Sequence, residues 1–257
     1  MNNMDHTTKI TTALLLAAGT GSRLKPFTDC MPKCLTKVDE IEILGRLMTC
    51  LRKNGFKRLV VVVGYFDHEI RSFLDKNAGD FTVEYIVNAD FATTNNIYSL
   101  WLAQEKINEP FLLIESDLVF DASLLEKMLV PDTIAVSQLS SWMNGTTITM
   151  DKFVTGLVSS INLSTHLNAN GSTLKTVNIY GLSLESWKRI CKRLDSWISA
   201  GKVNDYYEAV LSEMVADGSL KLQCIQFDMD RWYEIDTADD LYNCELILQQ
   251  NRLQLAG

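Results

Sequence analysis

A short stretch near the N-terminus combines glycines with basic residues in an order that suits a triphosphate. An apolar run at residues 14–17 leads into a loop with Gly19 and Gly21, and Arg23 and Lys33 follow. Glycines let backbone N–H groups approach phosphates closely, and the two cations add charge-assisted contacts. An ordinary strand-to-helix turn accounts for the glycines alone but not for Arg23 and Lys33. The pattern therefore predicts a triphosphate cradle.

The same residues exclude two other phosphate-binding motifs. A dinucleotide-binding turn requires GxGxxG, and Leu24 stands here where the last glycine would be. A P-loop requires a GKS or GKT ending, and none follows these glycines. A dehydrogenase or another dinucleotide-binding protein is therefore set aside.

The elements that must position this loop follow from the spacing of apolar residues. From Ala13 onward, short apolar runs alternate with amphipathic stretches, which is typical of βα units around a mainly parallel sheet. The predicted strands cover residues 14–17, 59–63, 83–87 and 111–114. The predicted helices cover residues 44–51, 67–76 and 96–107, with Asp67 as the N-cap of the second.

A carboxylate group directly follows the fourth predicted strand, in the sequence Glu115-Ser116-Asp117. The carboxyl ends of parallel strands are where α/β sheets place their chemistry, so Asp117 is a candidate functional residue. The alternative is a loop acid without a role in chemistry.

Beyond about residue 133 the pattern changes to strand-like runs at 134–139, 146–150 and 173–180, which predicts a smaller antiparallel layer over about 133–182. Helices are predicted again at 184–200 and 206–216, followed by a strand at 220–227. Thr237 is expected to cap a last helix through Gln250, with Asp240 near capping-box spacing. The expected organisation is one domain, 1–257, with residues 1–11 as an N-terminal extension.

Composition narrows the classes of partner. The net charge of −8 argues against nucleic-acid binding, which normally requires a basic patch. No run of about 18 apolar residues suggests a membrane span, and the polar N-terminus does not resemble a signal peptide, so we expect a cytoplasmic protein. The six cysteines form no CxxC pair, which favours buried thiols over a zinc site or a disulfide framework. The sequence leaves the oligomeric state open, a homodimer included.

The run LLAAGTGSRLKPFT at 15–28, followed by PKCL at 32–35, resembles the opening motif of the sugar-phosphate nucleotidyltransferase superfamily. Within it the chain is most similar, from about Thr12 to Leu248, to cytidylyltransferases for phosphocholine and for 2-aminoethylphosphonate. Further segments that carry the resemblance are VGY at 63–65, NNIYSL at 95–100, ESD at 115–117, KTVNIY at 175–180, NDYYE at 204–208 and WYEID at 232–236.

The resemblance implies a Rossmann-like, mainly parallel sheet flanked by helices, with direct attack of an acceptor phosphate on the α-phosphorus of an NTP. It implies Mg²⁺ as cofactor, with Asp117 and Asp236 as metal ligands and Glu234 as a third ligand or a neighbour that orients them. An acid at position 236 could instead favour the N-terminus of the last helix. The catalytic residues implied are Arg23, Lys33, Asp117 and Asp236, with Lys33 steadying the departing pyrophosphate. The nucleotide-binding residues implied are Leu16, Ala17, Ala18, Gly19, Thr20, Gly21, Arg23, Lys33, Asn88 and Asn95.

The acceptor site implied by the resemblance is less sharply defined. Lys175 stands where related enzymes carry a lysine for the acceptor phosphate, but without their Glu-Lys-Pro setting, and it is also compatible with a solvated strand end. An ammonium group on the acceptor would need carboxylates or aromatic faces. The residues expected to provide them or to lie beside them are Asn178, Asp205, Tyr206, Tyr207, Glu208, Trp142 and Trp232, although Tyr206 and Tyr207 are also compatible with core packing.

The resulting hypothesis is a cytidylyltransferase that moves CMP from CTP to 2-aminoethylphosphonate and releases pyrophosphate, for decoration of cell-surface glycans or lipids. One alternative is a phosphocholine or other sugar-phosphate nucleotidyltransferase. A second alternative is a domain that binds nucleotides without chemistry. That domain should have lost some of its charged site residues, whereas Arg23, Lys33, Asp117 and Asp236 are all present.

Overall fold

The computed structural model describes residues 9–140, 143–163 and 173–255, with side chains described up to residue 249. Trp142 and residues 1–8 of the expected N-terminal extension lie outside this part of the chain. Within it, no helix combines the length and apolar character needed to cross a membrane. All six cysteines are free, and Cys34, Cys50 and Cys244 are buried.

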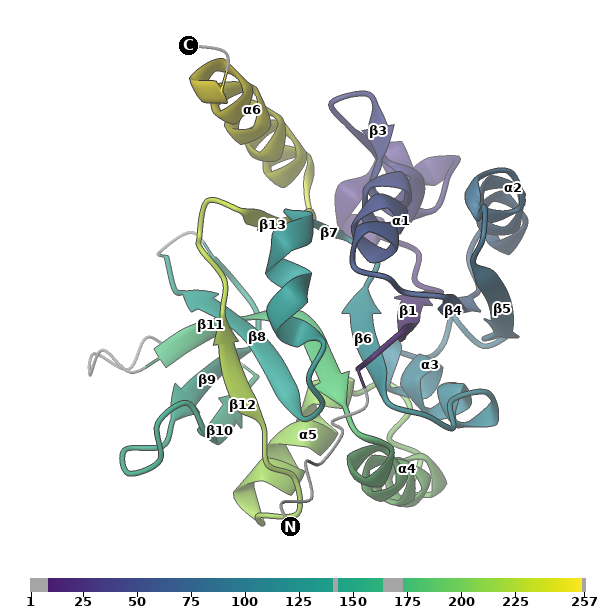
Figure 1. Cartoon of the computed structure of the whole chain (residues 1–257). Coiled ribbons are helices and arrows are strands. Elements are labelled where there is room, and N and C mark those ends of the chain that lie inside the picture. The colour runs from purple at the N-terminus through teal and green to yellow at the C-terminus, as the bar shows by residue number, and fades with distance from the viewer. Residues whose placement is uncertain (1–8, 141–142, 164–172, 256–257) are drawn as a thin grey trace.

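A mixed sheet of nine strands organises the described residues, and the predicted fold class is confirmed (Figure 1). Its main path runs β10-β9-β11-β6-β1-β4-β5, while β8 pairs with β11 and β12. The bounds are β1 Thr12–Ala17, β4 Arg58–Val63, β5 Thr82–Val87, β6 Phe111–Glu115, β8 Thr133–Gln138, β9 Thr147–Met150, β10 Val158–Asn162, β11 Thr173–Leu182 and β12 Gln223–Gln226.

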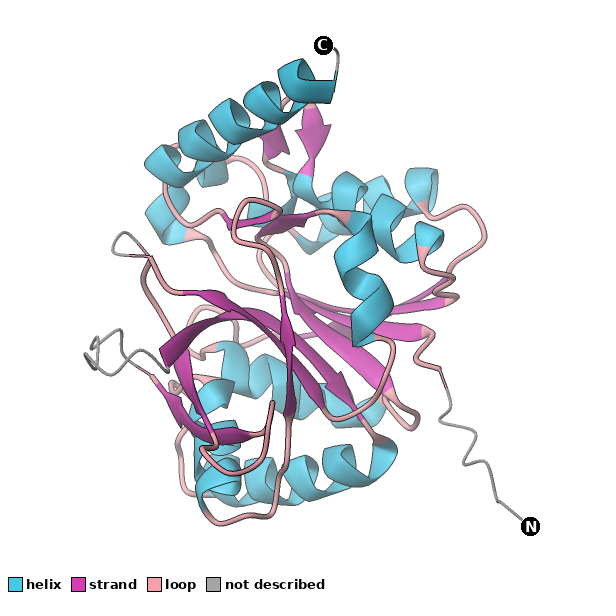
Figure 2. Ribbon diagram, turned by 60° about the vertical axis from the view of Figure 1, so that its left-hand side comes forward, coloured by secondary structure: helices cyan, strands magenta, loops and turns pink. Residues whose placement is uncertain are grey.

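The parallel half of the sheet is β6-β1-β4-β5, and helices cover both of its faces (Figure 2). Side chains alternate across β1, so Leu15 packs toward α1 (Ile43–Lys53) and α2 (Asp67–Asn77). Leu14 and Leu16 pack on the opposite face, against α3 (Asn96–Leu102), α4 (Leu184–Ser199) and α5 (Tyr207–Ala216). Burial on both faces explains why β1, β4 and β6 are nearly continuous apolar runs.

The antiparallel layer forms as predicted, with one strand more. β11 runs antiparallel to β6, β8 and β9, and thereby joins the two halves of the sheet. The additional strand, β10, pairs with β9, but its polar residues Ser159, Ser160 and Asn162 hid it from the apolar pattern. The register of β11 against β8 shifts between Thr176 and Tyr180, around Asn178 with φ of +58°.

Two short ribbons complete the strands. β2 (Lys37–Val38) pairs with β3 (Ile41–Glu42), and β7 (Leu118–Phe120) pairs antiparallel with β13 (Trp232–Glu234). Sequence patterns indicated none of these four strands, because each is only two or three residues long. The β7–β13 ribbon matters more for the arrangement of side chains, because it places the segment that begins at Asp117 beside the segment that begins at Trp232.

Helix ends test the predicted caps. The Thr237 and Asp240 capping box is confirmed: the Thr237 N–H donates to Asp240 Oδ2 at 2.8 Å, and the Asp240 N–H donates to Thr237 Oγ1 at 3.2 Å. α6 then covers Ala238–Leu255. The prediction that Asp67 caps α2 is wrong, because Phe66 in the left-handed region occupies that position and Asp67 is the first helical residue. The predicted helix at 96–107 ends as an α-helix at Leu102 and continues as a 3₁₀ turn over Ala103–Glu105.

Candidate active site

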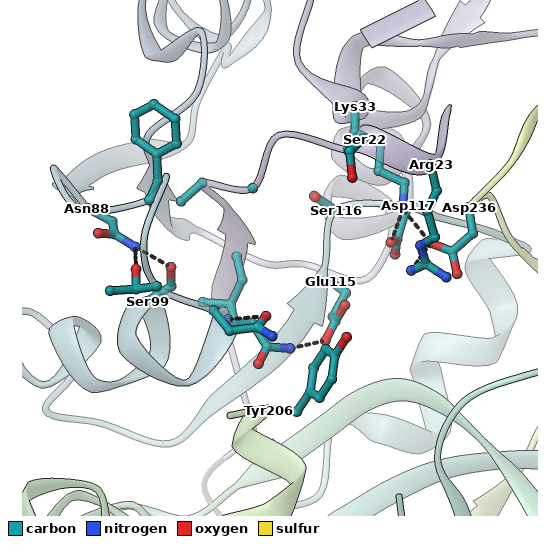
Figure 3. A pocket seen from close by; sticks show the side chains of 18 residues that line it. Ser22, Arg23, Lys33, Asn88, Ser99, Glu115, Ser116, Asp117, Tyr206 and Asp236 are labelled. Carbon is teal, nitrogen blue, oxygen red and sulfur yellow. Dashed lines mark hydrogen bonds and ion pairs between the residues drawn. The ribbon is translucent and has the colours of Figure 1, made fainter. Parts of the chain in front are cut away.

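A pocket of about 250 Å³ opens where β1 and β6 end, beside the glycine loop (Figure 3). Eight of the residues expected to bind the nucleotide line it: Leu16, Ala18, Gly19, Gly21, Arg23, Lys33, Asn88 and Asn95. The other two do not. Ala17 is buried in the core on the α1 side of the sheet, because side chains alternate along β1, and Thr20 is exposed. We refer to this cavity as the loop pocket.

The two glycines of the loop have different roles, and only Gly21 is required by the shape of the loop. Gly21 has φ of +62°, and a Cβ there would lie 3.0 Å from Thr28 Cγ2 and 3.1 Å from Lys33 Cβ. Gly19 differs, because a Cβ on it would meet nothing within 4 Å. Since Gly19 also lines the loop pocket, its missing side chain leaves room for a ligand against the backbone.

Two basic and two acidic side chains meet at one end of the loop pocket (Figure 3). Lys33 Nζ lies 2.6 Å from Asp117 Oδ2 and 2.7 Å from Asp236 Oδ1, and Arg23 Nη2 lies 2.8 Å from the same Asp236 oxygen. Burial alone would lower the pKa of Lys33, but the Asp117 and Asp236 carboxylates outweigh it and raise that pKa above its ordinary value. Lys33 therefore stays protonated, and the structure brings together all four residues predicted to be catalytic.

The β7–β13 ribbon explains how Asp117 and Asp236 become neighbours. Asp117 directly precedes β7, Glu234 ends β13, and the Ile235 N–H donates to the Asp117 carbonyl at 2.9 Å. Because β7 begins where its antiparallel partner β13 ends, residues far apart in the sequence are held side by side.

The two aspartates suit Mg²⁺ by their chemistry. Magnesium is commonly held by one or two carboxylates together with substrate phosphates, rather than by a complete protein cage. Accordingly, no cluster of three or more His, Cys, Asp or Glu side chains capable of holding a metal occurs within the described residues. Asp117 Oδ1 is buried and accepts no hydrogen bond from that part of the chain, so this oxygen remains available for a cation.

Glu234 points into a different environment from the one expected of a metal ligand. Its carboxylate lies 3.1 Å from Lys175 Nζ through Oε2 and accepts a hydrogen bond of 3.1 Å from Asn178 Nδ2 through Oε1. Burial raises the pKa of Glu234, while Lys175 acts in the opposite direction. Both oxygens of Glu234 are thus engaged with residues predicted to bind the acceptor.

A second pocket of about 140 Å³ adjoins the first, and we call it the lysine pocket. Arg23 and Asp236 line both pockets, so these two members of the charged cluster form the common wall. Lys175, only 2% exposed, lines the lysine pocket with its Nζ 6.0 Å from the centre of the Trp232 ring. Lys175 is therefore a buried, paired cation at a cavity and not the solvated strand end that was its alternative.

The remaining residues predicted to bind the acceptor are scattered. Tyr206 is exposed and lines the loop pocket, whereas Asp205 is exposed and lines neither pocket. Tyr207 is fully buried, with its ring edge-on to Tyr180 at 5.9 Å between centroids. Glu208 is also buried and lines neither pocket, and burial raises its pKa to about 7. Asn178 lines neither pocket, and it is connected to the lysine pocket only by its hydrogen bond to Glu234.

Some pocket residues were not predicted from the sequence to belong to a binding site. In the loop pocket they are Ser22, Phe91, Thr94, Asn96, Ser99, Glu115 and Ser116, and in the lysine pocket they are Met143, Asn144, Tyr233, Thr237 and Asp240. Asn96, Ser99 and Glu115 stand in segments that carried the family resemblance, so a signal for them existed. Phe91 and Met143 had none, because only the folded chain brings their loops to the cavities.

Comparison with known proteins agrees with this geometry. Residues 13–136 match the model of the MobA-like NTP transferase domain. CMP-5'-(3-aminopropyl)phosphonate synthase of Streptomyces rubellomurinus is 29% identical over 237 residues, which cover 89% of this chain and 37% of that protein. The bifunctional IPC transferase and DIPP synthase of Aquifex aeolicus is 27% identical over 252 residues, covering 96% of this chain and 54% of that protein. The chain thus spans about half or less of the length of these curated relatives.

A solved structure, the CTP:phosphocholine cytidylyltransferase of Streptococcus pneumoniae, superimposes with a TM-score of 0.80 at 21% identity. The superposition covers 93% of this chain and 99% of that one, and at this identity it shows the fold alone. Residues 13–136 of this chain are thus similar to a MobA-like NTP transferase domain, and the chain shares the fold of a solved cytidylyltransferase.

Proposed function

We propose that this protein is a Mg²⁺-dependent cytidylyltransferase that transfers CMP from CTP to 2-aminoethylphosphonate and releases pyrophosphate. One observation carries the proposal: the loop pocket and the lysine pocket share Arg23 and Asp236, with Lys33 and Asp117 at their junction. A nucleotide in one cavity and an acceptor in the other would then meet at the charged cluster.

The reaction joins a phosphonate oxygen of the acceptor to the α-phosphorus of CTP and breaks the bond to the β-phosphate oxygen. Negative charge accumulates on the leaving pyrophosphate, and the permanently charged Arg23 and Lys33 lie where they can offset it. A phosphonate dianion needs no base to attack. Catalysis in this scheme is positional and electrostatic.

Asp117 and Asp236 would hold the Mg²⁺, and the free Oδ1 of Asp117 is the atom best suited to it. When bound, the cation neutralises crowded phosphate charge. Lys33 Nζ now lies between the two carboxylates, so it must shift toward the phosphates as the substrates bind.

The lysine pocket carries the argument for a small zwitterionic acceptor. Lys175 offers a positive charge for a phosphonate, while Glu234 and Asp240 offer negative charge for an ammonium group. The relative from Streptomyces rubellomurinus is named for an aminopropylphosphonate, which differs from 2-aminoethylphosphonate only in chain length. That name supports an aminoalkylphosphonate as the acceptor class here.

Phosphocholine is the second candidate, because Trp232 and Tyr233 both line the lysine pocket. Aromatic faces bind quaternary ammonium groups well. The solved structure with a TM-score of 0.80 is a phosphocholine cytidylyltransferase, although it shows only that this fold can serve that reaction.

Pyrophosphate release tests the proposal directly. The purified protein is assayed with Mg²⁺ and CTP against 2-aminoethylphosphonate, phosphocholine, phosphoethanolamine and glucose-1-phosphate. The assay with the best acceptor is then repeated, once with UTP in place of CTP and once with EDTA. We expect the highest kcat/KM for 2-aminoethylphosphonate, preference for CTP and loss of turnover in EDTA. Preference for phosphocholine would support the same reaction with a different acceptor. Absence of pyrophosphate release with every acceptor, despite CTP binding, would favour a non-catalytic nucleotide-binding domain.

A further inference from the structure

The segment Val63-Gly64-Tyr65, at the end of β4, contacts the glycine loop at several points. A Cβ on Gly64 would lie 2.9 Å from the Ala18 carbonyl oxygen and 2.8 Å from Phe91 Cβ, so only glycine permits this approach. The Tyr65 N–H donates to that same Ala18 carbonyl at 3.0 Å. The start of the loop is therefore fastened to the backbone of Tyr65.

The side chain of Tyr65 reaches the far end of the loop. Its hydroxyl donates to the Thr28 carbonyl at 3.0 Å, and the fully buried Thr28 hydroxyl donates to the Gly21 carbonyl at 2.9 Å. Thr28 also supplies the Cγ2 that lies against Gly21. One tyrosine thus connects Ala18 with Gly21, and both residues line the loop pocket.

The Tyr65 ring also approaches Phe91, another residue that lines that pocket. Its centroid lies 6.1 Å from that of Phe91, and Phe91 is a lining residue contributed by the loop after β5. Tyr65 itself lines neither pocket. It touches the supports of the cavity and not the ligand space.

We propose that Tyr65, acting through Thr28, is a positioning residue that sets the glycine loop in the conformation that accepts the nucleotide triphosphate. This inference rests on the proposed function, since it requires a nucleotide in the loop pocket. When the loop is already in the binding conformation, the cost of ordering its backbone does not reduce the binding free energy of the nucleotide. Loss of one neutral hydrogen bond at such a loop corresponds to about a fivefold loss of affinity.

The test uses the full chain with Tyr65→Phe, which removes only the hydroxyl. We expect the Kd for CTP with Mg²⁺, measured by calorimetry, to rise about fivefold. The KM for CTP should rise similarly, while kcat at saturating CTP and the KM for the acceptor stay unchanged. Tyr85→Phe is the matched control, because it removes a buried hydroxyl that has no hydrogen-bond partner in the described chain, on the neighbouring strand β5.

Variants of Thr28 separate positioning from general stability. Thr28→Val should reproduce the effect, Thr28→Ser should restore wild-type affinity because it keeps the hydroxyl, and the Tyr65→Phe/Thr28→Val double variant should lose less than the product of the single losses. An unchanged CTP affinity in Tyr65→Phe, when the wild type binds CTP, would overturn the inference alone. A lower melting temperature with equal losses in kcat and both KM values would assign Tyr65 a merely structural role. If the wild type binds no CTP, the proposed function fails and the inference fails with it.

Discussion

The two pockets differ in how the chain builds them. The loop pocket draws its glycines and its two cations from one continuous stretch, 16–33, at the end of β1. The lysine pocket collects Lys175 from β11, Glu234 from β13 and Asn144 from a loop. A contiguous motif is constrained by its own backbone, whereas an assembled pocket depends on the register of strands that meet only in the folded state.

This difference suggests a division of tasks. The contiguous loop suits the part of the reaction common to nucleotidyltransferases, which is holding a triphosphate. The assembled pocket suits the variable part, since one residue can change there without disturbing the loop. Substitutions in the two regions should therefore affect different kinetic constants, and substitutions at their shared wall should affect all of them.

The largest effect is expected in the charged cluster, at Asp117, which lies beside the shared wall. Asp117→Asn should reduce kcat on the order of 100-fold to 1000-fold with the fold intact, because a neutral amide is a poor Mg²⁺ ligand. Pyrophosphate release and circular dichroism measure the two properties. Asp228→Asn, at a well-exposed carboxylate in the loop between β12 and β13, is the control. Near-normal turnover in Asp117→Asn would remove this residue from the metal site.

A smaller effect, confined to the nucleotide, is expected for Lys33→Ala. The loss of a charge-assisted contact to the phosphates should raise the KM for CTP about 10-fold to 100-fold. Lys37→Ala removes an exposed cation from the same basic stretch and should leave that KM unchanged. Kinetics of Lys33→Ala indistinguishable from the wild type would exclude its role in phosphate binding.

The acceptor side should respond separately. Lys175→Met is expected to raise the KM for the acceptor about tenfold while leaving the KM for CTP unchanged, because Lys175 lines only the lysine pocket. The melting temperature should fall, since Glu234 loses its ion-pair partner. The exposed Lys127 provides the control in Lys127→Met. An equal rise in both KM values would contradict the separation of the two pockets.

Substitution of Glu208 is expected to have the smallest kinetic effect and a measurable effect on the free energy of unfolding. Burial raises the pKa of Glu208 from 4.5 to about 7, so the folded protein binds a proton that the unfolded chain releases. The contribution of Glu208 to stability is therefore greatest below about pH 4.5 and is lost as the pH rises to about 7. Glu208→Gln should stabilise the protein at pH 8 by on the order of 1 to 3 kcal/mol and leave it unchanged near pH 4.5.

Urea unfolding at several pH values, together with the KM for the acceptor, measures both consequences of Glu208→Gln. Glu208 lines neither pocket, so the acceptor KM should stay that of the wild type. A raised acceptor KM with unchanged stability would restore the role that the family resemblance implied for Glu208.

The sequence by itself determined the parallel sheet, the antiparallel layer and the glycine loop. Each depends on local information. Buried strands appear as runs of apolar residues, and amphipathic helices place an apolar residue every three or four positions. Gly21 is required because the backbone has a positive φ at that position. The contiguous motif also predicted that Arg23 and Lys33 lie beside the glycine loop, and both line the loop pocket. The Thr237 and Asp240 cap was predictable for the same reason, because both partners lie within one turn.

The tertiary structure alone decided the arrangement of the charged cluster and the content of the lysine pocket. Lys33 meets Asp236 across 203 residues, through a ribbon whose two strands have three residues each. The tertiary structure also pairs Glu234 with Lys175, buries Tyr207 and Glu208 away from both pockets, and connects Tyr65 to Thr28. Such contacts depend on strand register and on which helix face turns inward, and these are set by packing of the whole chain rather than by the residues concerned.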